Sequence, residues 1–124
     1  MIQLAAKLTG VVLLAVGILG FVPGITTNEH LLGVFHVNTA HSIIHLLSGA
    51  AALTAGLTNV KASRLYFRIF GVVYGLVAIL GFVYGDRPIL GLVSNNMEDT
   101  LLHLAIATFA LAISFGFKSP TKKA

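Results

Sequence analysis

The sequence predicts an all-α integral membrane protein: a four-helix bundle made of two tandem helix–loop–helix hairpin repeats. Composition, four long apolar segments and an internal repeat predict this fold. Of 124 residues, 56% are hydrophobic and 10% are charged, and the mean hydropathy is +0.93. A soluble domain is typically about a quarter charged, so this chain cannot cover itself with polar surface in water. The composition excludes a water-soluble enzyme, a nucleic-acid-binding module and a disordered tail.

Four segments are long and apolar enough to cross a bilayer as helices. A hydrocarbon core about 30 Å thick needs roughly 20 mostly apolar residues in helical form, because backbone groups in lipid must be hydrogen-bonded within the segment. The qualifying segments are residues 4–22, 39–58, 65–84 and 100–117. A signal peptide is the alternative for the first segment, but no A-x-A cleavage site follows it.

The chain contains an internal duplication. Residues 10–24 (GVVLLAVGILGFVPG) and 71–85 (GVVYGLVAILGFVYG) are identical at ten of fifteen positions. Residues 32–46 and 90–104 are identical at five of fifteen. Two spans return the chain to the side where it began, so both units share one orientation about a pseudo-two-fold axis along the membrane normal.

The charges predict the orientation. Seven of the eight basic residues lie on the side that carries both termini and the central loop, and all four acids lie on the other side. This asymmetry is the positive-inside pattern, so we expect a multi-pass protein with both termini in the cytoplasm. The predicted organisation is a single transmembrane domain, 1–124, with repeat 1 at about 4–58, repeat 2 at about 65–117 and a basic cytoplasmic tail at 118–124.

Glycines in the first and third spans predict close helix packing. Lipid tails are as apolar as leucine, so membrane helices associate where small residues let their backbones approach. We expect this contact inside one chain, and the alternative is a homo-oligomer or a larger membrane complex joined through a glycine face. The G-x-x-x-G pairs are Gly20/Gly24, Gly71/Gly75 and Gly81/Gly85.

Polar and ionisable residues gather near the exterior ends of the second and fourth spans. Ionisable groups within membrane helices are costly and mark candidate functional sites. Three- and four-residue spacing places each set on one helical stripe. The repeat aligns Asn38 with Asn96, His41 with Asp99, and His45 with His103.

One interpretation of these stripes is structural. Asn38 and Asn96 are candidate N-caps, whose side-chain oxygens accept from the first free N–H groups of a helix. Asp99 then falls where an acid closes a capping box and complements the helix dipole. His45 and His103 would bond a neighbouring carbonyl or Ser48.

Three further interpretations give the stripes a function. H-x-x-x-H and D-x-x-x-H each place two ligands on consecutive turns, so three imidazoles and one carboxylate suit zinc or another divalent transition metal. A b-type haem held by His45 and His103 is a second possibility, and a proton relay or ion passage is a third. The candidate metal ligands are His41, His45, Asp99 and His103.

The motifs resemble a known family. The segments GFVPGIT, LLGVFHVN, HSIIHLLSG, RLYFRIFGVVYGLVAILGFV and NNMEDTLLHL are similar to those of small bacterial membrane proteins grouped as domain of unknown function 4383, over about residues 5–116. The resemblance implies a four-helix integral membrane protein. It also implies polar motifs at the second and fourth spans, filled here by Asn38, His41 and His45 and by Asn96, Asp99 and His103. It carries over no activity.

We therefore expect a small polytopic protein of the bacterial inner membrane, non-enzymatic, with a structural or accessory role in a larger assembly. The alternative is a metal- or haem-binding membrane protein that uses the histidine and aspartate cluster. A membrane-embedded hydrolase comes third, because the sequence has no nucleophile–base pair, phosphate-binding loop or H-E-x-x-H helix. The expected partner is the lipid bilayer, and we expect no binding to nucleic acid.

Overall fold

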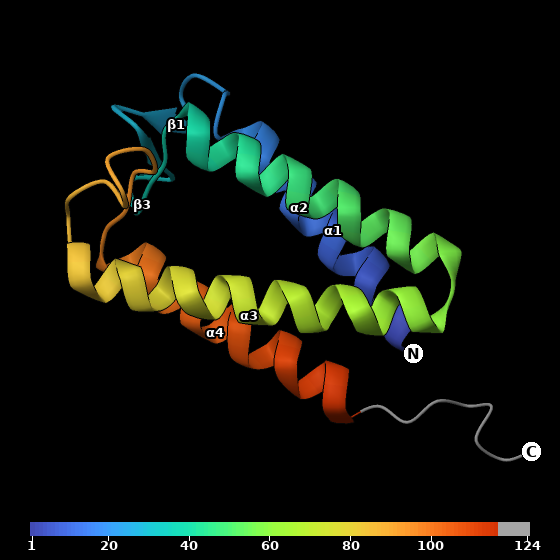
Figure 1. Cartoon of the computed structure of the whole chain (residues 1–124). Helices are drawn as coiled ribbons and strands as arrows, with labels where there is room; N and C mark the ends of the chain where they lie inside the picture. Colours follow the sequence, from blue (N-terminus) through green and yellow to red (C-terminus); the bar gives the residue numbers. More distant parts are fainter. Residues whose placement is uncertain (117–124) are drawn as a thin grey trace, which may run out of the picture.

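The computed structural model describes residues 1–116, and within them the chain forms four long helices and a small three-stranded sheet (Figure 1). All four helices are long and apolar enough to cross a membrane, which confirms the predicted all-α, membrane-type fold. The predicted basic tail at 118–124 lies outside the described residues. The helices are α1 (Ile2–Leu19), α2 (Thr39–Thr58), α3 (Val60–Tyr84) and α4 (Met97–Gly116).

Three helices begin earlier than predicted: α1 starts at Ile2 instead of residue 4 and ends at Leu19 instead of residue 22, without a side-chain cap, whereas side chains cap the other two. The prediction for α3 starts at residue 65, but the Asn59 side chain accepts a hydrogen bond from the Ala62 N–H at 2.7 Å and the helix begins at Val60. The prediction for α4 starts at residue 100, and the helix begins at Met97, directly after the capping Asn96. The bounds of α2 match the prediction.

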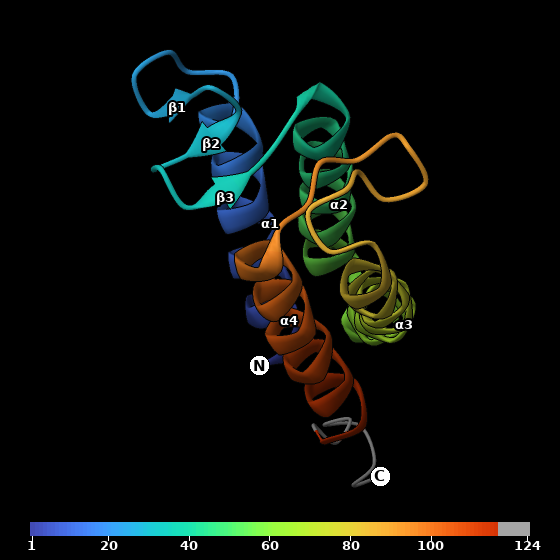
Figure 2. The same cartoon turned by 90° about the vertical axis from the view of Figure 1, so that its left-hand side faces the viewer.

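The helices pack as two antiparallel hairpins, α1 with α2 and α3 with α4. The N-terminus, the α2–α3 connection and the end of α4 lie at one end of the bundle, and the two longer loops lie at the other (Figure 1). Viewed toward that loop end, α1 and α2 stand side by side, with α4 and α3 beside them (Figure 2). Both hairpins therefore point the same way, as the repeat predicts.

Close packing inside each hairpin follows the repeat. A Cβ added at Gly10 of α1 would lie 2.7 Å from the backbone nitrogen of Leu53 in α2. A Cβ at the equivalent Gly71 of α3 would lie 2.7 Å from the side chain of Leu111 in α4, the repeat equivalent of Leu53. These glycines thus serve contacts within the chain. A second equivalent pair of contacts joins Gly20 to Ser42 and Gly81 to Thr100.

An aromatic core on α3 joins the two hairpins. Phe67, Phe70 and Tyr74 are buried, and the ring centroids of Phe70 and Tyr74 lie 4.2 Å apart. Aromatic rings bury large surfaces and pack in offset or edge-to-face arrangements, and this row packs against residues of both hairpins. The residues from α1 and α4 that pack in the same cluster are Ile2, Ala6, Leu13, Ala107, Ala110 and Ile113.

The loop between α1 and α2 holds a small antiparallel sheet that the sequence analysis did not predict. Its strands, β1 (Thr26–Thr27), β2 (His30–Leu31) and β3 (Phe35–His36), are paired in the order β1-β2-β3. Two-residue strands are too short to show an alternating hydrophobic pattern. Their turns use left-handed residues, among them Asn28 at φ 52° and Gly33 at φ 73°.

Candidate metal centre

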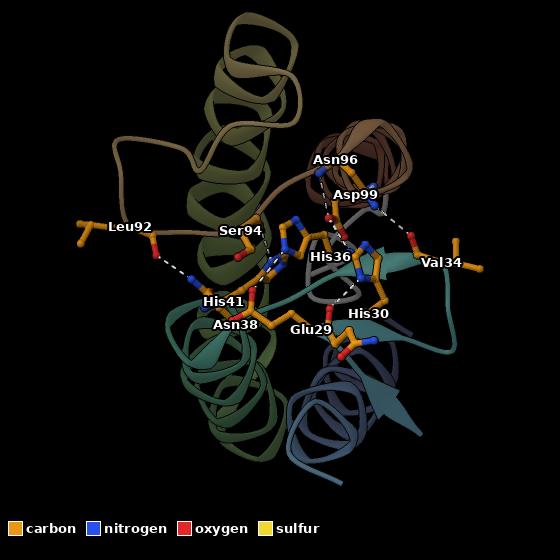
Figure 3. A network of polar contacts seen from close by, with 11 residues as sticks. Glu29, His30, Val34, His36, Asn38, His41, Leu92, Ser94, Asn96 and Asp99 are labelled. Carbon is orange, nitrogen blue, oxygen red and sulfur yellow. Dashed lines mark hydrogen bonds and ion pairs between the residues drawn. The ribbon is translucent and has the colours of Figure 1, made fainter. Parts of the chain in front are cut away.

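Two equivalent asparagines tie the loop ends of the hairpins together (Figure 3). Asn38 Nδ2 donates to the Leu92 carbonyl at 3.0 Å, and Asn96 Nδ2 donates to the Val34 carbonyl at 2.9 Å. Leu92 and Val34 are themselves equivalent in the repeat. Each hairpin therefore donates one hydrogen bond to the loop of the other, as a pseudo-two-fold axis requires.

The same asparagines cap their own helices. Asn38 Oδ1 accepts from the His41 N–H at 2.9 Å, and Asn96 Oδ1 accepts from the Asp99 N–H at 2.9 Å. The predicted N-caps are confirmed. Because both ends of each amide are engaged, each asparagine fixes the start of one helix against the opposite loop.

Asp99 is bonded to backbone donors. Its Oδ2 accepts from the Asn96 N–H at 3.1 Å, which closes the predicted capping box, and from the His36 N–H at 3.1 Å, which ties α4 to β3 (Figure 3). The repeat partner of Asp99 makes the matching contact: His41 Nδ1 lies 2.9 Å from the carbonyl of Ser94, the equivalent of His36. One position thus serves the same docking role with a carboxylate in one repeat and an imidazole in the other.

Three of the four candidate metal ligands come together at this end of the bundle. His41 and His45 of α2 and His103 of α4 each place a ligand nitrogen within 4.8 Å of the other two. The ring centroids lie 4.6 Å apart for His41 and His45, 5.4 Å for His41 and His103, and 6.2 Å for His45 and His103. All three side chains are buried. Asp99, one turn before His103, is not in this group.

Each of the three histidines has a buried ring nitrogen that lacks a hydrogen-bond partner among residues 1–116. These atoms are His41 Nε2, His45 Nδ1 and His103 Nδ1. Leaving one buried polar atom unpaired costs about 1–3 kcal/mol, so three such atoms in one cluster indicate a shared ligand. The structural interpretation placed His45 and His103 against a carbonyl or Ser48, and these two nitrogens make no such bond.

The hydrogen bond of His41 fixes its tautomer. A carbonyl oxygen can only accept, so Nδ1 carries the proton that is donated to Ser94, and the lone pair of the neutral ring lies on Nε2. Metal-binding histidines usually donate their other ring N–H to a carbonyl or carboxylate, which orients the ring and raises its basicity. His41 therefore has the outer contact that a metal ligand needs.

The three rings leave no room for a haem between His45 and His103. A haem with two axial histidines needs its macrocycle to lie between the two rings. The His41 ring is closer to each of them, at 4.6 Å and 5.4 Å, than they are to each other, at 6.2 Å. His41 thus occupies the space of the porphyrin plane, and the residues present fit a compact ion better.

Two residues of this region have a role that the sequence analysis missed. The Tyr74 ring meets His103 edge-on, with centroids 5.3 Å apart. Asn95 is fully buried, donates to the Gly85 carbonyl at 2.8 Å and accepts from the Thr100 hydroxyl at 3.2 Å. Asn95 directly precedes the capping Asn96 in the sequence, and this pair of asparagines could have indicated a second residue that anchors the loop. A tyrosine inside an apolar span gave no such signal.

One comparison with known proteins gives a match. No curated protein and no solved structure matches the chain. A family model described as domain of unknown function (DUF4383) matches residues 3–116, which is nearly all of the described structure. The resemblance seen in the sequence motifs is thereby confirmed, and the chain belongs to the DUF4383 family.

Proposed function

We propose that this protein is a multi-pass protein of the bacterial cytoplasmic membrane that binds a divalent transition metal between α2 and α4, near the exterior end of the bundle. From the sequence alone, we expect a structural or accessory role ahead of metal binding. One observation reverses that order: His41, His45 and His103 lie together, and each has a buried ring nitrogen without a hydrogen-bond partner among the described residues. With a structural role alone, these three nitrogens would stay without hydrogen-bond partners, which lowers the stability of the fold.

The donor set suits zinc and the neighbouring transition metals. Neutral imidazoles bind zinc at about 2.0–2.1 Å, usually in tetrahedral geometry. Three such nitrogens lie about 3.3 Å apart around one ion, so small side-chain rotations must bring the ligand atoms closer than their present spread of 4.8 Å. Three protein ligands leave a fourth position for water or a small molecule.

Metal analysis tests this proposal. We expect the protein, purified in detergent, incubated with zinc and freed of unbound ion, to retain about one zinc per chain. His45→Ala and His103→Ala will each reduce zinc to the background level, because two imidazoles hold the ion poorly. The matched control is His30→Ala, since the His30 ring stacks on His36 at 4.8 Å outside the cluster.

The outcome is measured by mass spectrometry of the metal, with helix content followed by circular dichroism. Equal zinc in the wild type and both cluster variants would contradict the proposal. A folded wild-type protein that retains neither zinc, copper, nickel nor iron would contradict it as well. Loss of zinc in His30→Ala would move the site to the loop.

Both termini are proposed to lie in the cytoplasm. Seven of eight basic residues support this orientation. The chain has no cysteine, so Lys61→Cys at the start of α3 and Asp86→Cys in the opposite loop are single-site probes, both exposed. On intact spheroplasts, an impermeant maleimide should label Asp86→Cys at once and Lys61→Cys only after lysis. The reverse order would overturn this topology.

A further inference from the structure

Two grooves lie between the hairpins, on the two sides of the bundle. The α2/α3 groove has a volume of about 380 Å³ and the α1/α4 groove about 370 Å³. The repeat relates them: Tyr66 and Tyr74 of the first groove align with Ala5 and Leu13 of the second. The duplication therefore supplies two versions of one groove, which can be compared position by position.

The two grooves differ in polarity. The α2/α3 groove has Ser48, Tyr66 and Tyr74 where the α1/α4 groove has Ile106, Ala5 and Leu13. Among the residues that line the α1/α4 groove, Thr9 carries the single polar side chain. An acyl chain of a bilayer lipid needs no polar group. The α2/α3 groove is therefore the more polar of the two and can hold an occupant that carries a polar group.

One of these phenols lacks a partner. The Tyr66 hydroxyl donates to the Ser48 carbonyl at 3.1 Å. The Tyr74 side chain is 3% exposed, and its hydroxyl is buried without a hydrogen-bond partner among residues 1–116. A buried phenol usually finds a partner, so Tyr74 provides a donor for an acceptor brought by a ligand.

The groove is also lined by flat surfaces. The Tyr66 and Phe70 rings are stacked, with centroids 5.0 Å apart and planes at 22°. Phe70 and Tyr74 continue the row at 4.2 Å. Offset stacking on such a row favours a ring over a flexible chain.

The depth of Tyr74 excludes the ester groups of phospholipids as the acceptor. Tyr74 lies well inside α3 (Val60–Tyr84), and at 1.5 Å per residue its Cα is about 15 Å from the nearer helix end. Phospholipid carbonyls lie at the edges of a hydrocarbon core about 30 Å thick. An acyl chain therefore brings no acceptor to this depth, whereas an apolar ring with its own carbonyl does.

We propose that the α2/α3 groove binds the headgroup of an isoprenoid quinone taken from the bilayer. A ring carbonyl accepts the hydrogen bond of Tyr74, the ring packs on the aromatic row, and the isoprenoid tail leaves toward the lipid. Because Tyr74 also meets His103, the headgroup lies beside the histidine cluster. This binding goes beyond the metal proposal and does not require an ion.

The test is equilibrium binding of a radiolabelled decyl-benzoquinone to the full chain in detergent micelles. We expect saturable binding that Tyr74→Phe weakens about tenfold, the effect of one lost hydrogen bond. A second variant gives the α2/α3 groove a residue of the α1/α4 groove: Ala51 is the repeat equivalent of Phe109, which lines the α1/α4 groove. Ala51→Phe fills the space and should abolish saturable binding.

Thr9→Val is the matched control, because it removes a hydroxyl from the α1/α4 groove and should leave the affinity unchanged. Equal affinity in the wild type, Tyr74→Phe and Ala51→Phe would overturn the proposal, and so would a loss confined to Thr9→Val. Binding is measured on metal-free protein and repeated with His45→Ala. Quinone binding that persists where zinc binding fails separates this proposal from the metal site.

Discussion

Replacing Gly49 with alanine is expected to lower the free energy of unfolding by about 3 kcal/mol. A Cβ on Gly49 would lie 2.8 Å from the Leu14 nitrogen and 2.9 Å from the Gly10 carbonyl oxygen. Both atoms belong to the backbone of α1, so no side-chain rotation relieves the clash. The two helices must separate, and in lipid their association depends on this close approach.

The other hairpin provides the control. Gly75 of α3 faces Ala107 of α4, and Ala107 is the repeat equivalent of Gly49. A Cβ added to Gly75 would have its nearest neighbour, the Ala107 Cβ, at 3.9 Å. Gly75→Ala should therefore be neutral, or stabilise by about 0.5–1 kcal/mol because alanine favours helix. Unfolding in mixed micelles with increasing dodecyl sulfate, followed by circular dichroism, measures both variants. Similar values for Gly49→Ala and Gly75→Ala would refute this account of the packing.

Asp99→Ala should destabilise the protein by about 3 kcal/mol. The Asp99 side chain accepts from two backbone N–H groups, of Asn96 and His36. Its removal leaves both donors without that partner, and an unpaired buried donor costs about 1–3 kcal/mol. The substitution also removes the side chain that closes the capping box at the start of α4. Both the first turn of α4 and the docking of β3 should loosen.

Hydrogen exchange resolves this effect by position. The amides of His36 and Asn96 should lose protection in Asp99→Ala, while amides in the middle of α2 keep theirs. Glu98→Ala is the neighbouring control: it removes an exposed acid from the same helical turn and should change stability by less than about 0.5 kcal/mol. If His36 keeps its protection in Asp99→Ala, the carboxylate does not anchor the loop.

Hydropathy and the repeat were sufficient to predict the fold, because a chain in lipid has few ways to satisfy its backbone. They did not place the starts of α3 and α4, which are set by single side chains, Asn59 and Asn96, that a hydropathy average does not register. The β1–β3 sheet was also missed. Its strands are held by turns with left-handed residues rather than by a hydrophobic pattern.

The candidate site was predicted in part. The spacing put His41 and His45 on one helical stripe and the repeat aligned His45 with His103, and the structure brings the three histidines together. The orientation of Asp99 was not predictable, because its partner His36 is in a loop 63 residues away. The contact between Tyr74 and His103 was not predictable either, because it depends on how α3 and α4 pack.

The crossed asparagine contacts at the loop end bear on how this chain arose. A single hairpin would leave the Asn38 amide and the Val34 carbonyl unmatched, yet two identical hairpins facing one another would satisfy both, as in any symmetrical dimer. In such an ancestor every substitution occurs twice. Joining the copies in one gene let each half change independently. Asp99, the repeat equivalent of His41, and Tyr74, the repeat equivalent of Leu13, are differences of this kind between the halves.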